Sequence, residues 1–257
     1  MQKNAAATVT GRVSSVETFG SVDGPGIRFV AFLAGCPLRC LYCHNPETWE
    51  PIRGTERTAP DLLRQALRYR PYWKGGGGLT VSGGEPMAQM PFVTELFRLA
   101  KEAGVSTCLD TSGALFSREG TTFVAVQSLL AVTDLVLLDL KHIDPARHEQ
   151  LTGLRNEHIL DFAQYLSEIQ KPVWIRHVLV PGHTDDATSL QLLARFIAGL
   201  KNVARVEVLP YHRMAVHKYA DMALPYRLGD TPEPSEESIR RAEAILRVAD
   251  YGGYKKH

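Results

Sequence analysis

Short runs of apolar residues alternate with longer amphipathic segments along this chain of 257 residues. Most of the runs are rich in Val, Leu and Ile with little polar alternation, which is typical of parallel strands covered on both faces. We expect strands at Ile27–Leu33, Leu79–Ser82, Ser106–Asp110, Leu135–Leu140, Val173–Val180 and Val206–Leu209.

The amphipathic segments between these runs predict helices. Pro60 and Pro91 stand in the first turns of two of them, where proline is tolerated. The expected helices are Pro60–Tyr69, Pro91–Ala103, Phe123–Ala131, Asn156–Gln170 and Asp185–Gly199, followed by a C-terminal helix at Ser235–Val248. Repeated strand–helix units predict an α/β fold, and six repeats indicate a partial (β/α)6 TIM-type barrel with parallel strands.

Three of the four cysteines lie within one short segment, as Cys36-x3-Cys40-x2-Cys43. A [4Fe–4S] cluster is usually held by four thiolates, one for each iron. Three thiolates in one loop would leave one iron without a protein ligand and open to a small molecule. The spacing therefore favours an iron–sulfur cluster with one vacant coordination position.

A structural zinc site is the main alternative, with His44 as a fourth ligand beside the three cysteines. Such sites usually close with a distant second pair of ligands, whereas here the fourth cysteine is isolated and His44 adjoins Cys43 too closely to wrap one ion comfortably. An odd group of cysteines in a chain of this size does not suggest a disulfide framework. The fourth cysteine, Cys108, lies inside an apolar run and is expected to be a small buried side chain without chemistry.

Composition limits the remaining possibilities. Apolar residues make up 44% of the chain and charged residues 22%, and no break divides it. We therefore expect a single domain over residues 1–257, with residues 1–10 as a frayed lead-in. The net charge of +1 predicts no nucleic-acid partner, and no apolar stretch approaches the roughly 18 residues of a membrane span. A thiol cluster without an export signal predicts the cytoplasm.

Distinctive polar groups follow the expected strands at their carboxyl ends. In parallel α/β folds the loops at this edge build the ligand site, so we expect these groups to converge. They are Cys36–Cys43, Gly83-Gly84-Glu85-Pro86, Asp110-Thr111, Asp139 with Lys141, and Tyr211-His212.

Taken together, these motifs resemble the radical S-adenosylmethionine (SAM) enzymes, and among them the glycyl-radical-enzyme activases, closest to those of pyruvate formate-lyase. The similarity covers essentially the whole chain. It is carried by Asp23-Gly24-Pro25-Gly26-Ile27-Arg28, Cys36-x3-Cys40-x-Tyr42-Cys43-His44-Asn45, Ser82-Gly83-Gly84-Glu85, Cys108-Leu109-Asp110-Thr111, Leu138-Asp139-Leu140-Lys141, Trp174-Ile175-Arg176, Val180-Pro181-Gly182 and Leu209-Pro210-Tyr211-His212.

The resemblance implies a specific chemistry. The three cysteines would ligate a single [4Fe–4S] cluster, and the amino and carboxylate groups of SAM would chelate the fourth iron. Reductive cleavage of SAM would give methionine and a 5′-deoxyadenosyl radical, which would take a hydrogen from a glycine Cα of pyruvate formate-lyase in anaerobic glucose metabolism. The protein supplies ligation, orientation and shielding from solvent.

The resemblance also implies roles for further residues, each with a simpler reading as a turn glycine, a loop histidine or an ion pair. Asp110, Thr111 and Asp139 would surround a monovalent cation. Asp23 and Arg176 would lie near the glycine loop of the partner. The expected SAM contacts are Tyr42, His44, Gly83, Gly84, Asp139, Leu140, Lys141 and His212.

Partners and alternatives complete the sequence-based hypothesis. A flavodoxin- or ferredoxin-type protein is the expected electron donor. Many activases carry an inserted ferredoxin-like domain with extra cysteine clusters, whereas this chain has no such cysteines, so we expect one cluster only. Alternatives are a radical SAM enzyme acting on another glycyl radical enzyme or on a small molecule, and a noncatalytic zinc-binding barrel.

Overall fold

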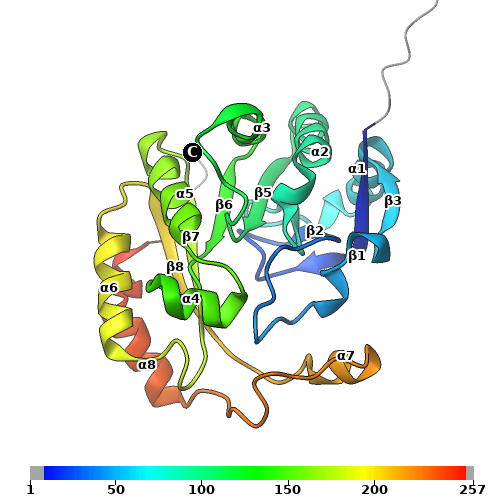
Figure 1. Cartoon of the computed structure of the whole chain (residues 1–257). Helices are drawn as coiled ribbons and strands as arrows, with labels where there is room; N and C mark the ends of the chain where they lie inside the picture. Colours follow the sequence, from blue (N-terminus) through cyan, green and yellow to red (C-terminus); the bar gives the residue numbers. More distant parts are fainter. Residues whose placement is uncertain (1–8, 253–257) are drawn as a thin grey trace, which may run out of the picture.

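Six parallel strands form the main part of the sheet, as the apolar runs predicted. The computed structural model describes residues 9–252. Its eight strands lie in the order β3-β1-β2-β4-β5-β6-β7-β8, and every neighbouring pair from β2 to β8 is parallel (Figure 1). The strands are β1 (Thr10–Gly20), β2 (Arg28–Leu33), β3 (Thr55–Thr58), β4 (Gly78–Gly83), β5 (Ser106–Thr111), β6 (Leu135–Asp139), β7 (Val173–Leu179) and β8 (Val203–Pro210). The open, curved sheet confirms the predicted partial TIM-type barrel.

Helices connect successive parallel strands and lie against the outer side of the sheet (Figure 1). The expected helices are all present, with ends within three residues of the predicted bounds. The α-helices are α1 (Ala59–Leu67), α2 (Met90–Glu102), α3 (Gly120–Ala131), α4 (Pro145–Thr152), α5 (Glu157–Glu168), α6 (Ala187–Ala198), α7 (Val216–Asp221) and α8 (Glu236–Ile245). Short 3-10 turns include η1 (Pro46–Thr48), η2 (Pro51–Arg53), η3 (Arg70–Tyr72), η4 (Pro86–Gln89) and η5 (Val248–Asp250).

The two faces of the sheet bury different sets of side chains. Successive residues of a strand point to opposite faces, so Val136 and Leu138 join the large apolar core beneath the helices. Leu135 and Leu137 instead join Cys108 in a smaller buried cluster. Cys108 is 0% exposed, which confirms the expected small buried side chain.

Two strands and two helices were missed by the sequence analysis. β1 pairs antiparallel with both β2 and β3, so the sheet gains an antiparallel edge. β1 alternates polar and apolar residues because one side is exposed, and this pattern differs from the continuous apolar runs of the buried strands. α4 and α7 are short helices of eight and six residues. Thr10 lies in β1, so it is wrong to place it in a frayed lead-in; residues 1–8 of that segment lie outside the described residues.

Buried histidine makes the stability of this fold depend on pH. His148 of α4 is 0% exposed, and its Nδ1 lies 2.6 Å from the carbonyl oxygen of Leu154. Burial lowers the pKa of His148 to about 4. In the unfolded chain a histidine titrates near 6.5, so below this pH the unfolded state binds the additional proton. Stability from this group is complete above about pH 6.5 and is lost progressively as the pH falls toward 4.

We expect the free energy of unfolding to fall by about 2–3 kcal/mol between pH 7 and pH 4 on account of His148. Urea unfolding of the wild type and of His148→Gln, compared across this range at matched iron content, measures the effect. The variant should show the shallower pH dependence. Equal slopes for the two proteins would contradict the assignment.

Candidate active site

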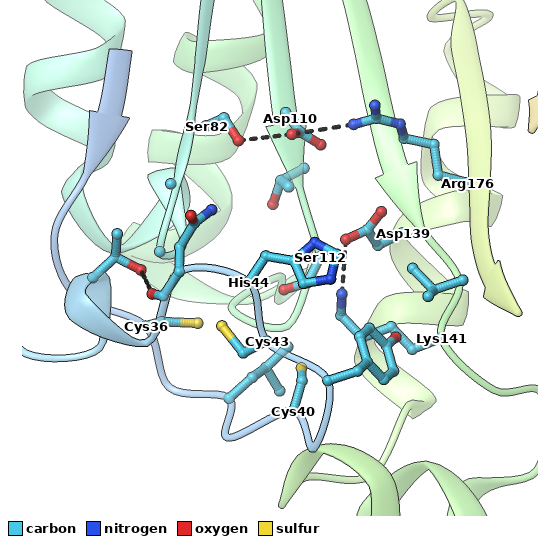
Figure 2. Close-up of a pocket in the computed structure, with 18 of the residues that line it drawn as sticks. Cys36, Cys40, Cys43, His44, Ser82, Asp110, Ser112, Asp139, Lys141 and Arg176 are labelled. Carbon is cyan, nitrogen blue, oxygen red and sulfur yellow. Dashed lines mark hydrogen bonds and ion pairs between the residues drawn. The ribbon is translucent and has the colours of Figure 1, made fainter. Parts of the chain in front are cut away.

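A cavity opens at the carboxyl ends of the parallel strands, where the sequence analysis placed the site (Figure 2). It gathers residues from loops that are distant in sequence, as the strand order requires. The predicted residues that line it are Cys36, Cys40, Tyr42, Cys43, His44, Gly83, Gly84, Asp110, Thr111, Asp139, Lys141 and Arg176. Three predicted residues, Asp23, Leu140 and His212, are not part of this lining.

The cysteine loop leaves β2 and is anchored on both sides by backbone hydrogen bonds. Arg39 N donates to the carbonyl of Thr152 (2.7 Å) and Leu41 N to that of Leu151 (2.9 Å), which ties the loop to α4. Cys36 N donates to the carbonyl of Trp49 (3.1 Å). The side chains of the three cysteines therefore meet at one end of the cavity, as Figure 2 shows.

The chemistry of these thiols fits an iron–sulfur cluster. Burial raises the pKa of Cys36 to about 12 and that of Cys40 to about 11, so both thiols are protonated at neutral pH without added positive charge. Iron would supply that charge and hold the thiolates. In residues 9–252, no group of three or more His, Cys, Asp or Glu side chains converges in a way that could hold one metal ion. In a cubane each thiolate binds a different iron.

The glycine pair after β4 is required by the packing of the backbone. Gly83 has φ +110°, and a Cβ there would lie 2.3 Å from the backbone N of Leu33. A Cβ on Gly84 would lie 2.4 Å from the carbonyl oxygen of Gly35, at the start of the cysteine loop. The pair therefore brings the ends of β2 and β4 together beneath the cavity. Its contact with SAM stays a prediction.

Glu85 follows the glycine pair and is fully buried. The sequence analysis assigned no role to this residue. Its Oε1 accepts hydrogen bonds from Thr111 Oγ1 (2.5 Å) and Met87 N (3.0 Å), and its Oε2 accepts from Ser112 N (2.9 Å) and Ser112 Oγ (2.5 Å). Burial raises the pKa of Glu85, and the hydrogen bonds oppose that rise. The side chain thus fastens the β4 loop to the β5 loop. The sequence offered one signal for this role, a carboxylate directly after two glycines.

We expect Glu85→Gln to lower the free energy of unfolding by about 1–3 kcal/mol. Hydroxyl donors can turn to accept, but the backbone N–H groups of Met87 and Ser112 cannot. In either orientation the new amide NH2 therefore faces one of these two N–H groups. Urea unfolding measures the loss, with Glu95→Gln as the control that should change little, because Glu95 is half-buried and pairs with the partly exposed Arg98 of the same helix. A stability equal to that of the wild type would contradict the hydrogen bonds assigned to both carboxylate oxygens.

Asp139 and Lys141 form an ion pair at the end of β6. Lys141 Nζ lies 2.7 Å from Asp139 Oδ2, and the ammonium stands 5.8 Å from the centre of the Tyr42 ring (Figure 2). Burial disfavours the ammonium, but Asp139, Tyr42 and Cys40 together outweigh that effect and raise the pKa of Lys141 well above its ordinary value. The pair presents a carboxylate and an ammonium to the cavity, which suits the hydroxyl and carboxylate groups of SAM.

Asp110 and Arg176 form a second pair deeper in the barrel. Arg176 Nη1 lies 3.3 Å from Asp110 Oδ2, which also accepts a hydrogen bond from Ser82 Oγ (2.7 Å). Burial raises the pKa of Asp110, and Arg176 opposes that rise. Asp110 pairs with Arg176, Asp139 pairs with Lys141, and Thr111 donates a hydrogen bond to Glu85. The cation site stays a prediction.

Asp23 lies near this pair but outside the cavity lining. Burial raises the pKa of Asp23 to about 6, and the nearby Asp110 adds to the rise. Arg176 Nη2 donates to the carbonyl of Val22 (2.6 Å), so the segment that contains Asp23 is fastened to β7. Asp23 and Arg176 are therefore neighbours, as a shared role would require, while their contact with a partner stays a prediction.

The two histidines predicted at the site lie against each other. The rings of His44 and His212 stack with centroids 4.0 Å apart, and His44 Nε2 lies 3.3 Å from the carbonyl oxygen of His212. Burial lowers the pKa of His44 to about 4, and His212 contributes to the decrease. Both rings are therefore close to the cysteine loop, although only His44 lines the cavity. Leu140 lies in the apolar core, so its side chain does not face the cavity.

Three residues around the cysteine loop were missed by the sequence analysis. Trp49 lines the cavity, and α7 brings Lys218 and Tyr219 against the loop. Lys218 Nζ donates to the carbonyl of His44 (2.9 Å), and Tyr219 Oη donates to that of Cys43 (2.9 Å). No local pattern could have found α7, because its contacts join positions about 175 residues apart.

Known proteins resemble this chain in sequence and in fold. The family model described as the Radical SAM superfamily matches residues 30–193. This chain belongs to the radical SAM superfamily. A protein of Streptococcus mutans named pyruvate formate-lyase-activating enzyme is 50% identical over 250 residues, which cover 96% of this chain and 95% of the relative. A Listeria monocytogenes protein of the same name is 49% identical over 95% of this chain and 98% of the relative.

Solved structures agree with the radical SAM fold. A domain of the pyruvate formate-lyase-activating enzyme from Bacteroides vulgatus superimposes with a TM-score of 0.55 at 26% identity, covering 70% of this chain and 98% of that one. SuiB of Streptococcus suis, bound to its precursor peptide SuiA, gives 0.63 at 20% identity over 89% of this chain and 46% of that one, which shows the fold alone. Radical SAM proteins use a [4Fe–4S] cluster and SAM, in keeping with the thiols described above. Within residues 9–252, no helix has the length and apolar character needed to cross a bilayer.

Proposed function

We propose that this radical SAM protein activates pyruvate formate-lyase by removing a hydrogen atom from the Cα of one of its glycines. The observation that carries the proposal is the convergence of three thiols with Asp139 and Lys141 in one cavity, in a chain half identical to proteins named as activases of that enzyme. When bound, the cluster supplies the electron that cleaves SAM into methionine and a 5′-deoxyadenosyl radical.

In this proposal the residues of the chain bind, orient and shield. Cys36, Cys40 and Cys43 would hold the cluster and leave one iron to SAM. Lys141 and Asp139 would bind the polar groups of SAM, and the buried Tyr42 would cover one side. Enclosure by these side chains keeps water from the radical, which would otherwise lose its specificity.

The protein substrate and the electron donor are also proposals. A glycine of a macromolecule must reach the cavity, and we propose that Asp23 and Arg176 contact the loop that carries it. We infer that a flavodoxin- or ferredoxin-type protein supplies the electron, that the chain works in the reducing cytoplasm, and that residues 1–257 act as one radical SAM domain. The continuous sheet of the described residues supports the last point.

A direct experiment tests the activity. Reduced, reconstituted protein incubated anaerobically with SAM and pyruvate formate-lyase should give a glycine-centred doublet in electron paramagnetic resonance. Formation of 5′-deoxyadenosine without this doublet would remove the activase assignment and favour another glycyl radical enzyme or a small molecule as substrate. Zinc at one per chain, with no iron or sulfide, would instead favour a noncatalytic barrel.

A further inference from the structure

The segment that follows β8 folds back over the end of the cysteine loop. Its helix α7 packs against η1, which comes directly after that loop in the chain (Figure 1). The sheet itself leaves these parts of the molecule unconnected, because in the described part of the chain β8 pairs with β7 and with no other strand. Contacts made by α7 therefore join the loops that follow the first and the last of the parallel strands.

Lys218 makes the central contact between α7 and the chain after Cys43. Its ammonium donates to the carbonyl of His44 (2.9 Å), to Asn45 Oδ1 (3.2 Å) and to Glu47 Oε1 (2.6 Å). An ammonium has three N–H donors, so these three acceptors use all of them. Because the acceptors belong to residues that follow Cys43 within four positions, Lys218 fixes the course of the chain as it leaves the last cysteine.

The helix that carries Lys218 is itself fixed to the end of β8. Tyr219 Oη donates to the carbonyl of Cys43 (2.9 Å), and the ring of Tyr219 meets that of Tyr226 edge to face at 5.0 Å. The hydroxyl groups of Tyr226 and Tyr211 lie 2.6 Å apart, and Tyr211 directly follows β8 and is fully buried. The bonds from Lys218 therefore restrain the cysteine loop against the barrel instead of following its motion.

We propose that Lys218 is a positioning residue that latches α7 onto the cysteine loop and thereby slows the loss of the bound cluster. Movement of Cys43 away from Cys36 and Cys40 requires local opening of the chain that Lys218 holds, and local opening is easiest where few contacts restrain a loop. Loss of groups that hold metal ligands in place typically changes metal affinity or activity by about 10–100-fold. The inference rests on the proposed function only in requiring these cysteines to hold a cluster.

Lys218→Met keeps the apolar stem and removes all three donors. In the reconstituted protein under anaerobic conditions, we expect iron release to a chelator to become about tenfold faster, the lower end of that range, because Lys218 binds the chain beside a ligand and not the ligand itself. Lys171→Met is the matched control. Lys171 is also partly buried and donates to a carbonyl, that of Thr133 (2.7 Å), but it precedes the amino end of β7, at the opposite edge of the sheet. Its release rate should equal that of wild type, and an unchanged rate in Lys218→Met would overturn the proposal.

Lys218→Arg separates the loss of donors from a general disturbance of α7. A guanidinium keeps the charge and offers five N–H donors, and the partly exposed position leaves room for the larger group. Iron release should therefore return towards the wild-type rate. Release as fast as that of Lys218→Met would show that the packing of α7, rather than the donated hydrogen bonds, holds the loop, and the proposal would be wrong.

Hydrogen exchange measures the restraint on the loop without reference to activity. Thr48 N donates to the carbonyl of Asn45 (2.9 Å) and Trp49 N to that of Pro46 (3.1 Å), so both amides report on opening of the chain after Cys43. In Lys218→Met they should exchange about tenfold faster than in wild type, as expected when a hydrogen bond from a charged group is lost from the closed state.

The same amides should exchange at the wild-type rate in Lys171→Met. Wild-type exchange in Lys218→Met, in protein that holds a cluster, would refute the inference alone. Wild-type protein that takes up no cluster would instead refute the proposed function.

Discussion

Replacing Cys40 by alanine is expected to abolish cluster binding and to reduce SAM cleavage by more than about 100-fold. Losing only a residue that hydrogen-bonds to a metal ligand already lowers metal affinity or activity by up to about 100-fold, and here the ligand itself is removed. Two thiolates would remain for four irons, and no other cysteine of the described residues lines the cavity. The fold should survive, since Cys40 belongs to none of the apolar clusters of the core. Iron and sulfide content, 5′-deoxyadenosine formation and circular dichroism measure the three effects.

Cys108→Ala is the matched control for this experiment. Cys108 is fully buried on the inner face of β5, away from the cavity lining, so the variant should keep its cluster and its turnover at a small cost in stability. Retained SAM cleavage in Cys40→Ala would contradict the ligand assignment. Complete loss of activity in a folded Cys108→Ala protein would show that Cys108 has a role beyond packing.

Gly83→Ala is expected to lower the free energy of unfolding by roughly 3–5 kcal/mol, the sum of backbone strain at positive φ and overpacking. The new Cβ would lie 2.3 Å from Leu33 N and 2.6 Å from Leu33 O, so β2 and β4 would have to separate. That separation would also disturb the bond from Gly84 N to Leu33 O (2.8 Å) and displace the cysteine loop. Urea unfolding and iron content after reconstitution both report the change.

Gly182→Ala separates the clash from the cost of the backbone conformation. Gly182 has φ +75°, and no atom lies within 4 Å of its expected Cβ. This control should therefore lose only about 1–2 kcal/mol and keep its cluster. Equal losses in the two variants would mean that the close approach of β2 and β4 does not limit the substitution at Gly83.

The sequence predicted the parallel strands well because burial on both faces leaves continuous apolar runs such as Leu135–Leu138. It missed β1, whose exposed side interrupts the apolar pattern with polar residues. The short α4 and α7 were missed as well. Such helices depend on tertiary contacts more than on their own sequence, as the bond from Lys218 to the carbonyl of His44 illustrates.

The residues that line the cavity were predicted more completely than the residues that hold them in position. Cysteine spacing and polar groups at strand ends identify residues that face the cavity, because chain direction fixes where those ends meet. The partners of those residues come from packing between distant segments. Glu85 binds Ser112, and Trp49 contacts Tyr219, and neither pair follows a local periodicity. The same reason explains why Leu140, assigned to SAM by resemblance, turns its side chain into the core.

The proposed activity requires a cluster that is held by three thiolates and completed by SAM at its fourth iron. Electron paramagnetic resonance of the reduced protein, recorded anaerobically with and without SAM, tests this point most directly. The account predicts one [4Fe–4S] cluster per chain whose resonance shifts when SAM is added. A spectrum that saturating SAM leaves unchanged, or four cysteine sulfur ligands per cluster, would contradict it.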